Sequence, residues 1–279
     1  MVGGSISLPM SGYPSASPSL TTAMFSGCIE ERDTYEITDW DNVDLTRALD
    51  LDLDLVPNPS DPDTQWRPML HEFSYEREIW WNGTGTFKKD PVTTRNDYLM
   101  AAWANLSTCP TRSQKLQEMT SAEIAAYVDG LQVGGHTYHD IGMIWGGRLI
   151  SPTGLFAEEN ADVDSKPTNR HLIFLTDGET APRDISYGTY GIEPLVERRW
   201  SQSSALTLTQ VVEGRFGVAC NEVKKRNVTV WVIGFGTTMT DLMKSCAGDG
   251  HWFQADDAAE LGETFSKIAK AMGELRIAK

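Results

Sequence analysis

Asp177 is the residue of this sequence best placed to bind a ligand. It follows an apolar run, His171-Leu-Ile-Phe-Leu-Thr176, and precedes Gly178 and Glu179. An apolar run of this length that stops at a glycine turn is typical of a strand buried on both faces in a parallel sheet. In open α/β sheets, ligands sit beyond the carboxyl ends of the strands. We therefore predict that the Asp177 carboxylate faces a divalent metal ion.

Thr137 offers a second oxygen. It ends a Gly134-Gly-His-Thr137 turn that precedes a segment with helical periodicity. A hydroxyl and a carboxylate from separate loops are hard oxygen ligands, which suit Mg²⁺, Mn²⁺ or Ca²⁺. Each residue also has an ordinary structural interpretation, because Asp-Gly is a common turn pair and Thr is a good helix N-cap. No Lys follows the two glycines, so this turn does not predict a phosphate-binding loop.

The elements that must position these residues alternate between helix and strand over residues 109–279. Helical periodicity predicts helices over residues 121–131, before Pro152, up to about Arg226, over 239–246 and over 257–275. Besides the strand before Asp177, strands are expected over 228–233 and 251–254. Strand–helix–strand repetition with short turns predicts right-handed crossovers and a parallel sheet.

The first part of the chain divides into two segments. Residues 1–25 are rich in Ser, Pro and Gly and predict a flexible lead-in. Residues 26–108 are expected to be irregular but folded, since a disordered segment would not carry so many aromatic residues. Within them, strict Leu/Asp alternation over 49–55 predicts a half-buried strand with an acidic outer face. A calcium loop of the EF-hand type does not fit this repeat, because the required Gly and Glu positions hold other residues.

The composition limits the classes of partner. The chain has 279 residues with nine Trp, enough for a sizeable core, and a formal net charge of −15. An acidic surface repels nucleic acid and anionic lipid, so neither is an expected partner.

No apolar run reaches the length of about 18 residues that a membrane helix needs, and the start lacks the features of a signal peptide. If the protein works outside the cytosol, its export signal is expected upstream of Met1.

Four cysteines are scattered along the chain: Cys28, Cys109, Cys220 and Cys246. None forms a C-x-x-C pair, and no His is spaced as a zinc partner. An even, scattered set suits two disulfides in an oxidising compartment, and it also suits four buried thiols. If disulfides form, we expect the pairs Cys28–Cys109 and Cys220–Cys246, because each pair then lies within one half of the chain.

Several motifs of the second half carry a family resemblance. The segments Gly134-Gly-His-Thr-Tyr, Gly142-Met-Ile-Trp-Gly-Gly-Arg-Leu-Ile-Ser-Pro152 and Leu172-Ile-Phe-Leu-Thr-Asp-Gly-Glu179 resemble a von Willebrand factor A domain. More narrowly, they resemble the version in TadG-like proteins of the Tad/Flp pilus-assembly system. The segment from Cys246 to Leu261 and the segment Cys28-Ile-Glu-Glu-Arg32 are similar to the same proteins. The resemblance covers most of residues 26–279 and is strongest over 130–279.

The resemblance implies an α/β fold of the Rossmann-like von Willebrand factor A type, with a mostly parallel sheet flanked by helices and residues 26–108 as an insert. It also implies a metal-ion-dependent adhesion site built by three loops, in which the second supplies Thr137 and the third supplies Asp177. The first loop, Asp-x-Ser-x-Ser, and the membrane helix of TadG-like proteins do not occur in this sequence. The expectation is therefore an amino-terminally truncated chain. Two oxygen ligands and water rarely hold a divalent cation tightly, so binding is expected to be weak.

A non-enzymatic function follows from the resemblance. The expected role is a protein-binding or assembly module of the Tad pilus machinery, in which a pilus or envelope component presents an acidic side chain to the metal. The expected location is the periplasm or cell envelope, with a membrane tether in the full-length form. One alternative is a structural adhesin or surface-protein fragment without a working metal site.

The other alternative is a metal-dependent hydrolase that uses Asp177 and a His. The sequence has no H-E-x-x-H or G-x-S-x-G motif to support it. His136, His139, His171 and His251 are scattered, and each is expected to be a packing or surface residue.

Overall fold

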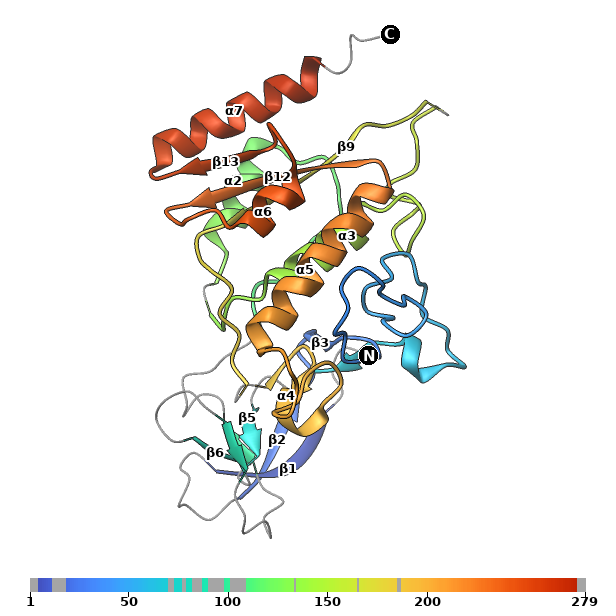
Figure 1. The fold of residues 1–279 in the computed structure, drawn as a ribbon, viewed down its shortest axis with the longest axis vertical. Coiled ribbons are helices and arrows are strands. Elements are labelled where there is room, and N and C mark those ends of the chain that lie inside the picture. Colours follow the sequence, from blue (N-terminus) through green and yellow to red (C-terminus); the bar gives the residue numbers. More distant parts are fainter. Residues whose placement is uncertain are drawn as a thin grey trace. The chain divides into compact units, whose positions relative to one another are not determined.

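The computed structural model describes residues 5–11, 19–69, 73–76, 79–81, 87–89, 98–100, 109–132, 134–164, 166–184 and 187–274. The chain divides into two compact units. The first comprises residues 1–50, 56–136 and 182–211, and the second comprises residues 51–55, 137–181 and 212–279. The sequence colours of Figure 1 show that each unit combines segments that are far apart along the chain.

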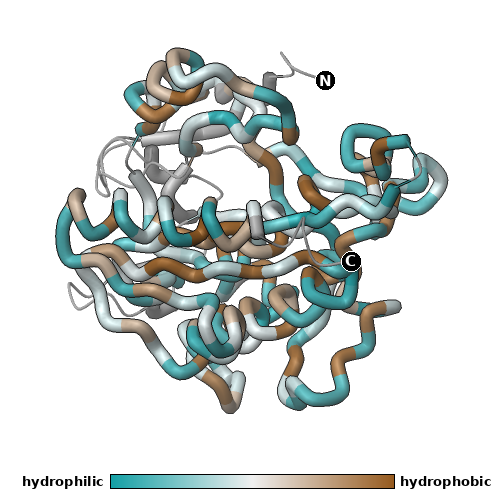
Figure 2. Tube along the Cα trace, turned by 90° about the horizontal axis from the view of Figure 1, so that it is seen from above, coloured by the Kyte–Doolittle hydropathy of each residue, from teal (hydrophilic) through white to brown (hydrophobic). Residues whose placement is uncertain are grey.

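A parallel three-stranded sheet organises the second unit. Its strands are β9 (Arg170–Thr176), β12 (Val228–Phe235) and β13 (Trp252–Ala255), in the order β13-β12-β9. Both neighbouring pairs run parallel, as predicted. In Figure 2, hydrophobic stretches cross the middle of the view, and many segments at its margin are hydrophilic. The structure thus confirms a mixed α/β fold with a parallel sheet flanked by helices, which is compatible with a Rossmann-like fold.

Four helices accompany this sheet. They are α3 (His139–Ile150), α5 (Leu208–Lys225), α6 (Asp241–Ala247) and α7 (Ala258–Glu274), and Figure 1 draws α7 on one side of the strands and α3 and α5 on the other. On the α7 side, Ile268 packs against Trp231 and Ile233 of β12. On the opposite side, the Phe174 ring lies 5.1 Å from the Phe216 ring of α5. Both faces of the sheet therefore contribute to the core, since successive side chains of a strand point to opposite faces.

Glycines bring α3 close to β9. A Cβ atom on Gly146 would lie 3.0 Å from a methyl carbon of Leu172, and one on Gly142 would lie 3.2 Å from the Phe174 ring. These contacts leave little room for a larger side chain on this face of the helix. The close approach places the first turn of α3 beside the carboxyl end of β9, where Asp177 follows.

β9 is less buried than the sequence predicts. Leu175 is 47% exposed, whereas residues 230–234 of β12 are all buried. In the described part of the chain β9 pairs only with β12, so it lies at an edge of this sheet. The prediction of a parallel strand before Asp177 is confirmed, but the prediction of burial on both faces was wrong. α7 packs over β12, and its cover does not extend to Leu175 at the edge.

The Leu/Asp repeat of residues 49–55 forms turns, and the prediction of a strand with a solvated acidic face was wrong. Asp50 is fully buried, and its Oδ2 accepts a 2.5 Å hydrogen bond from the Tyr190 hydroxyl. The Asp54 amide donates to Asp52 Oδ1 at 3.0 Å, a local side-chain-to-backbone bond that favours a turn. The Leu/Asp alternation is therefore not the signature of a pleated strand here, because the Asp side chains bond to different partners in a series of turns.

The first unit contains short strands and little helix. β1 (Ser5–Ser11), β2 (Ser19–Met24), β5 (Phe73–Glu76) and β8 (Tyr98–Met100) form a sheet in the order β2-β1-β8-β5. Three further pairs are β3 (Ile29–Glu30) with β4 (Arg67–Pro68), β6 (Ile79–Trp81) with β7 (Phe87–Lys89), and β10 (Tyr187–Gly188) with β11 (Gly191–Ile192). The helical elements are η1 (Pro62–Thr64), α2 (Ser121–Asp129) and α4 (Glu193–Val196).

Each unit contains one disulfide. Cys28 bonds to Cys109 in the first unit, and Cys220 bonds to Cys246 in the second. These are the two pairs expected from the sequence. Disulfides form and persist in oxidising compartments, so they are compatible with a location outside the cytosol. Among the described residues, no helix combines the length and the hydropathy that a membrane crossing requires.

Candidate functional site

The structure places Thr137 beside the loop that carries Asp177. β9 ends at Thr176, so Asp177 is the first residue beyond the carboxyl end of that strand. Thr137 forms an isolated antiparallel bridge with Ala181, whose amide donates a 3.1 Å hydrogen bond to the Thr137 carbonyl. The turn before α3 and the loop after β9 therefore run side by side.

The Thr137 hydroxyl lies near Gly178. A Cβ atom on Gly178 would lie 3.9 Å from Thr137 Oγ1. Asp177 is exposed and Thr137 is half-buried, so a solvent-borne ion can reach the carboxylate. A hydroxyl and a carboxylate are donor types that Mg²⁺ and Mn²⁺ accept. No cluster of three His, Cys, Asp or Glu side chains suited to a metal occurs in the ranges that the structure describes.

His139 connects α3 to both sides of the Asp177 turn. Its Nε2 lies 3.0 Å from Thr176 Oγ1, and its Nδ1 lies 2.9 Å from Thr180 Oγ1. The side chain is buried, and its ring lies 5.6 Å from the Phe174 ring in an edge-to-face contact. One imidazole therefore joins the residue before Asp177 to the residue that follows Glu179.

Burial lowers the pKa of His139, and a hydrogen bond with the backbone of Gly178 offsets part of that effect. Desolvation disfavours the charged imidazolium, because a buried ion loses its hydration. The net effect is a pKa below the ordinary value. The lowered pKa favours the neutral imidazole, in which one ring nitrogen donates and the other accepts.

A small pocket lies next to His139. Its lining comes from α3, α5, α6 and the loops after β9 and β12, and consists of His139, Thr180, Glu213, Phe216, Thr240, Leu242 and Met243. Its volume is about 10 Å³, which is room for about one water molecule. This pocket is too small for an organic substrate, so it is not a substrate site.

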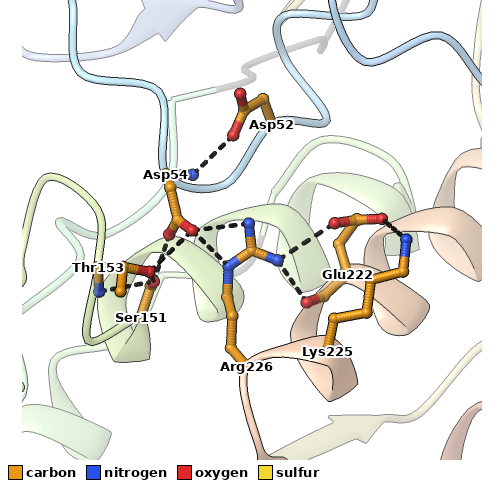
Figure 3. Close-up of polar contacts among 7 residues, drawn as sticks. All are labelled: Asp52, Asp54, Ser151, Thr153, Glu222, Lys225 and Arg226. Atoms are coloured by element: carbon orange, nitrogen blue, oxygen red, sulfur yellow. Dashed lines mark hydrogen bonds and ion pairs between the residues drawn. The ribbon is translucent and has the colours of Figure 1, made fainter.

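Asp54 anchors a second polar cluster, shown in Figure 3. Its Oδ2 accepts hydrogen bonds from Arg226 Nε at 3.0 Å and from Thr153 Oγ1 at 2.8 Å, and its Oδ1 accepts one from Ser151 Oγ. Arg226 lies between Asp54 and Glu222, and its Nη1 is 3.2 Å from Glu222 Oε2. Burial raises the pKa of Asp54, but the bonds from Arg226, Ser151 and Thr153 outweigh it and hold that pKa below its ordinary value.

Arg199 centres a buried cluster in the first unit. Its Nε and Nη2 donate to Glu193 Oε1 at 2.9 and 2.5 Å, and both side chains are almost fully buried. The guanidinium also lies 3.7 Å from the centre of the Tyr190 ring, whose hydroxyl bonds to Asp50. The charges of this cluster pair with one another, so it has the character of a structural core and not of an open site.

Sequence reasoning did not link His139 to the Asp177 turn or Asp54 to its hydrogen-bond partners. His139 was expected to be a packing or surface residue, and Asp54 was expected on a solvated strand. The sequence Thr176-Asp-Gly-Glu-Thr180 did contain one usable signal, because two hydroxyl residues flank the candidate ligand. No local pattern links Asp54 to Arg226.

The fold and this geometry define a mixed α/β protein with a parallel sheet flanked by helices and oxygen donors at the carboxyl end of a strand. Comparisons with protein-family models, curated proteins and solved structures find no match to this chain.

Proposed function

We propose that this chain is a non-enzymatic protein-binding module whose Thr137 and Asp177 bind a divalent cation, Mg²⁺ or Mn²⁺. The observation that carries the proposal is the position of the Thr137 hydroxyl, which lies near Gly178, the residue after Asp177 at the carboxyl end of β9. Ligands of open α/β sheets bind at this end of the strands. The exposure of Asp177 leaves the cation accessible to a partner.

The cation supplies a positive charge to which an acidic side chain of the partner binds. Asp177 provides the negative charge that attracts the cation, and Thr137 provides a neutral oxygen. Two protein donors leave further coordination positions to water and to the partner. Affinity for the cation alone is therefore expected to be low and to rise when the partner is present.

The biological context that we propose is the Tad pilus machinery, with the chain as an assembly or adhesion module of the von Willebrand factor A type in the periplasm or cell envelope. The support is the resemblance of residues 134–179 to TadG-like proteins, together with two disulfides that suit an oxidising compartment. Partners would then be pilus or envelope proteins.

A structural adhesin fragment without a working metal site is the second candidate. The observation that favours it is the lack, within the described ranges, of any group of three or more metal-binding side chains. In this case the parallel sheet and the disulfides serve stability alone, and Asp177 only stabilises its turn.

Calorimetric titration with Mn²⁺ and Mg²⁺ separates the two candidates. The wild-type chain is expected to bind with a dissociation constant on the order of 1 mM, as weak extracellular sites do. Asp177→Asn and Thr137→Val are expected to weaken binding by about tenfold or more, since each removes an oxygen ligand. The matched control is Asp249→Asn, which changes another exposed Asp before a Gly and is expected to leave the affinity unchanged. Equal affinity of the wild type and Asp177→Asn contradicts the metal site.

A further inference from the structure

We propose that His139 is the positioning residue of this site, and that the chain Thr180–His139–Thr176 fixes the turn that sets the Asp177 carboxylate against Thr137. The purpose of this arrangement rests on the proposed metal site. The hydrogen bonds themselves do not, because they join protein atoms only.

The available protons decide which atom donates in each hydrogen bond of the series Thr180–His139–Thr176. The Thr176 hydroxyl donates its only proton to the Gly178 carbonyl at 3.1 Å, and its oxygen accepts from the Gly178 amide at 3.3 Å. It therefore has no proton left for His139, so His139 Nε2 carries the proton of the 3.0 Å bond. In a neutral imidazole Nδ1 then accepts, and the Thr180 hydroxyl donates to it at 2.9 Å. The tautomer inferred from this network is Nε2–H.

The two threonines hold the turn at both ends. Thr176 immediately precedes Asp177, and Thr180 follows it three positions later. Both bond to the same ring, which belongs to the first residue of α3 and packs against Phe174 and Phe216. The ring therefore cannot shift without disturbing the core beneath it, and the turn between its two anchors has few conformations.

A turn that is already fixed helps a site with few protein ligands to bind a cation. A site with only two protein oxygens gains little from each contact, so any loss of loop freedom on binding has a large relative effect on affinity. A turn already held by His139 loses little freedom when a cation binds, which is the advantage of a ligand supported by neighbouring hydrogen bonds. His139 also lies two positions after Thr137, so one residue couples both candidate ligands.

The first test uses the metal-free chain. We expect ¹⁵N NMR of the imidazole to give the shifts of an Nε2–H tautomer. The variants Thr176→Val and Thr180→Val keep the shape of the side chain and remove the hydroxyl, and amide exchange over residues 177–181 is expected to become about tenfold faster. Thr180→Ser is expected to restore slow exchange. The matched control is Thr229→Val, at the opposite end of the sheet beside His171, and it is expected to leave exchange in the turn unchanged.

The second test measures Mn²⁺ affinity in the same proteins. Thr180→Val is expected to weaken Mn²⁺ binding several-fold with little change in melting temperature, and Thr180→Ser is expected to restore binding. An Nδ1–H tautomer, or unchanged exchange in both valine variants, overturns the positioning role. If exchange accelerates as expected but the wild type binds no Mn²⁺, the fixed turn is supported and the proposed metal function fails.

Discussion

The Asp54 carboxylate lies 2.9 Å from the Arg226 guanidinium, although the two residues are 172 positions apart in the sequence. This ion pair holds the short segment 51–55 in the second unit, which otherwise begins at residue 137. The same segment buries Leu51 and Leu53. Residues 51–55 therefore belong to the second unit, whereas the residues that flank them in the sequence, 1–50 and 56–136, belong to the first.

Replacement of Asp54 by Asn is expected to lower the free energy of unfolding by about 2 kcal/mol near neutral pH, because hydrogen bonds to a charged group each contribute about 1.5–3 kcal/mol. The pKa of Asp54 is lowered in the folded protein from an ordinary value of 3.8. A group of this kind stabilises the protein above its ordinary pKa and loses that effect as the pH falls through its folded pKa. The difference between wild type and variant should therefore shrink below about pH 4, as measured by urea unfolding.

The control for this prediction is Asp52→Asn. Asn retains an oxygen that can accept the bond from the Asp54 amide, so this variant is expected to change stability by less than about 0.5 kcal/mol. A difference between wild type and Asp54→Asn that stays constant down to about pH 3 would show that the ion pair is not the source of the effect.

Gly147→Ala is expected to destabilise the protein by about 1–2 kcal/mol. A Cβ atom at this position would lie 2.7 Å from Leu53 Cδ1 and 2.7 Å from Val223 Cγ2. Overpacking a core costs about 1–3 kcal/mol, which exceeds the roughly 0.8 kcal/mol that Ala gains over Gly in a helix. The matched variant is Gly262→Ala in α7, where no atom lies within 4 Å and a gain of about 0.5–1 kcal/mol is expected. Thermal melts of both variants check the pair, and a stabilised Gly147→Ala would contradict the packing of Leu53.

Removal of the Cys220–Cys246 disulfide, by Cys→Ala at both positions, is expected to lower the free energy of unfolding by about 3 kcal/mol. The bond closes a loop with a sequence separation of 26, and loops of this size give about that value in the chain-entropy model. The Cys28–Cys109 bond has a separation of 81, so its removal is expected to cost about 1 kcal/mol more. Urea unfolding measures both, and peptide mapping without reductant should recover the two linked peptides. Four free thiols would refute the pairing.

Glu193→Gln is expected to cost about 3 kcal/mol or more. This change removes the Glu193 charge from its buried pair with the Arg199 guanidinium, and breaking a buried pair costs about 3–5 kcal/mol. The control is Glu263→Gln in α7, whose 4.0 Å pair with Lys267 is exposed and is expected to contribute less than about 1 kcal/mol. Chemical unfolding followed by tryptophan fluorescence compares the two, and equal effects would argue against a buried ion pair.

Much of the second unit was predictable because its periodicity is local. Phe216, Ala219, Cys220 and Val223 recur at helical spacing, and all four are buried in α5. The apolar run of β12 likewise predicted a central strand. Burial on a particular face was less predictable. α2 has the expected helix and a complete capping box at Thr120 and Glu123, yet it has no buried residue among the helical positions.

The remaining features of the fold and the site were harder to predict, because they depend on partners that are distant in the sequence. Period-two alternation predicted a strand over 49–55, but Asp50 bonds to Tyr190 and Asp54 bonds to Arg226. The proximity of Thr137 and the Asp177 loop agrees with the resemblance, which already assigns both residues to one site. His139 could not be assigned in the same way, because its two partners lie 37 and 41 positions away.

The segment around Asp54 is synthesised long before the residues that it contacts. Arg226 follows it by 172 positions, which takes on the order of 10–30 s at the usual rate of translation. Val223, which lies beside Leu53 at Gly147, is also among the last of these residues to be synthesised. The second unit therefore cannot finish folding until most of the chain has been synthesised.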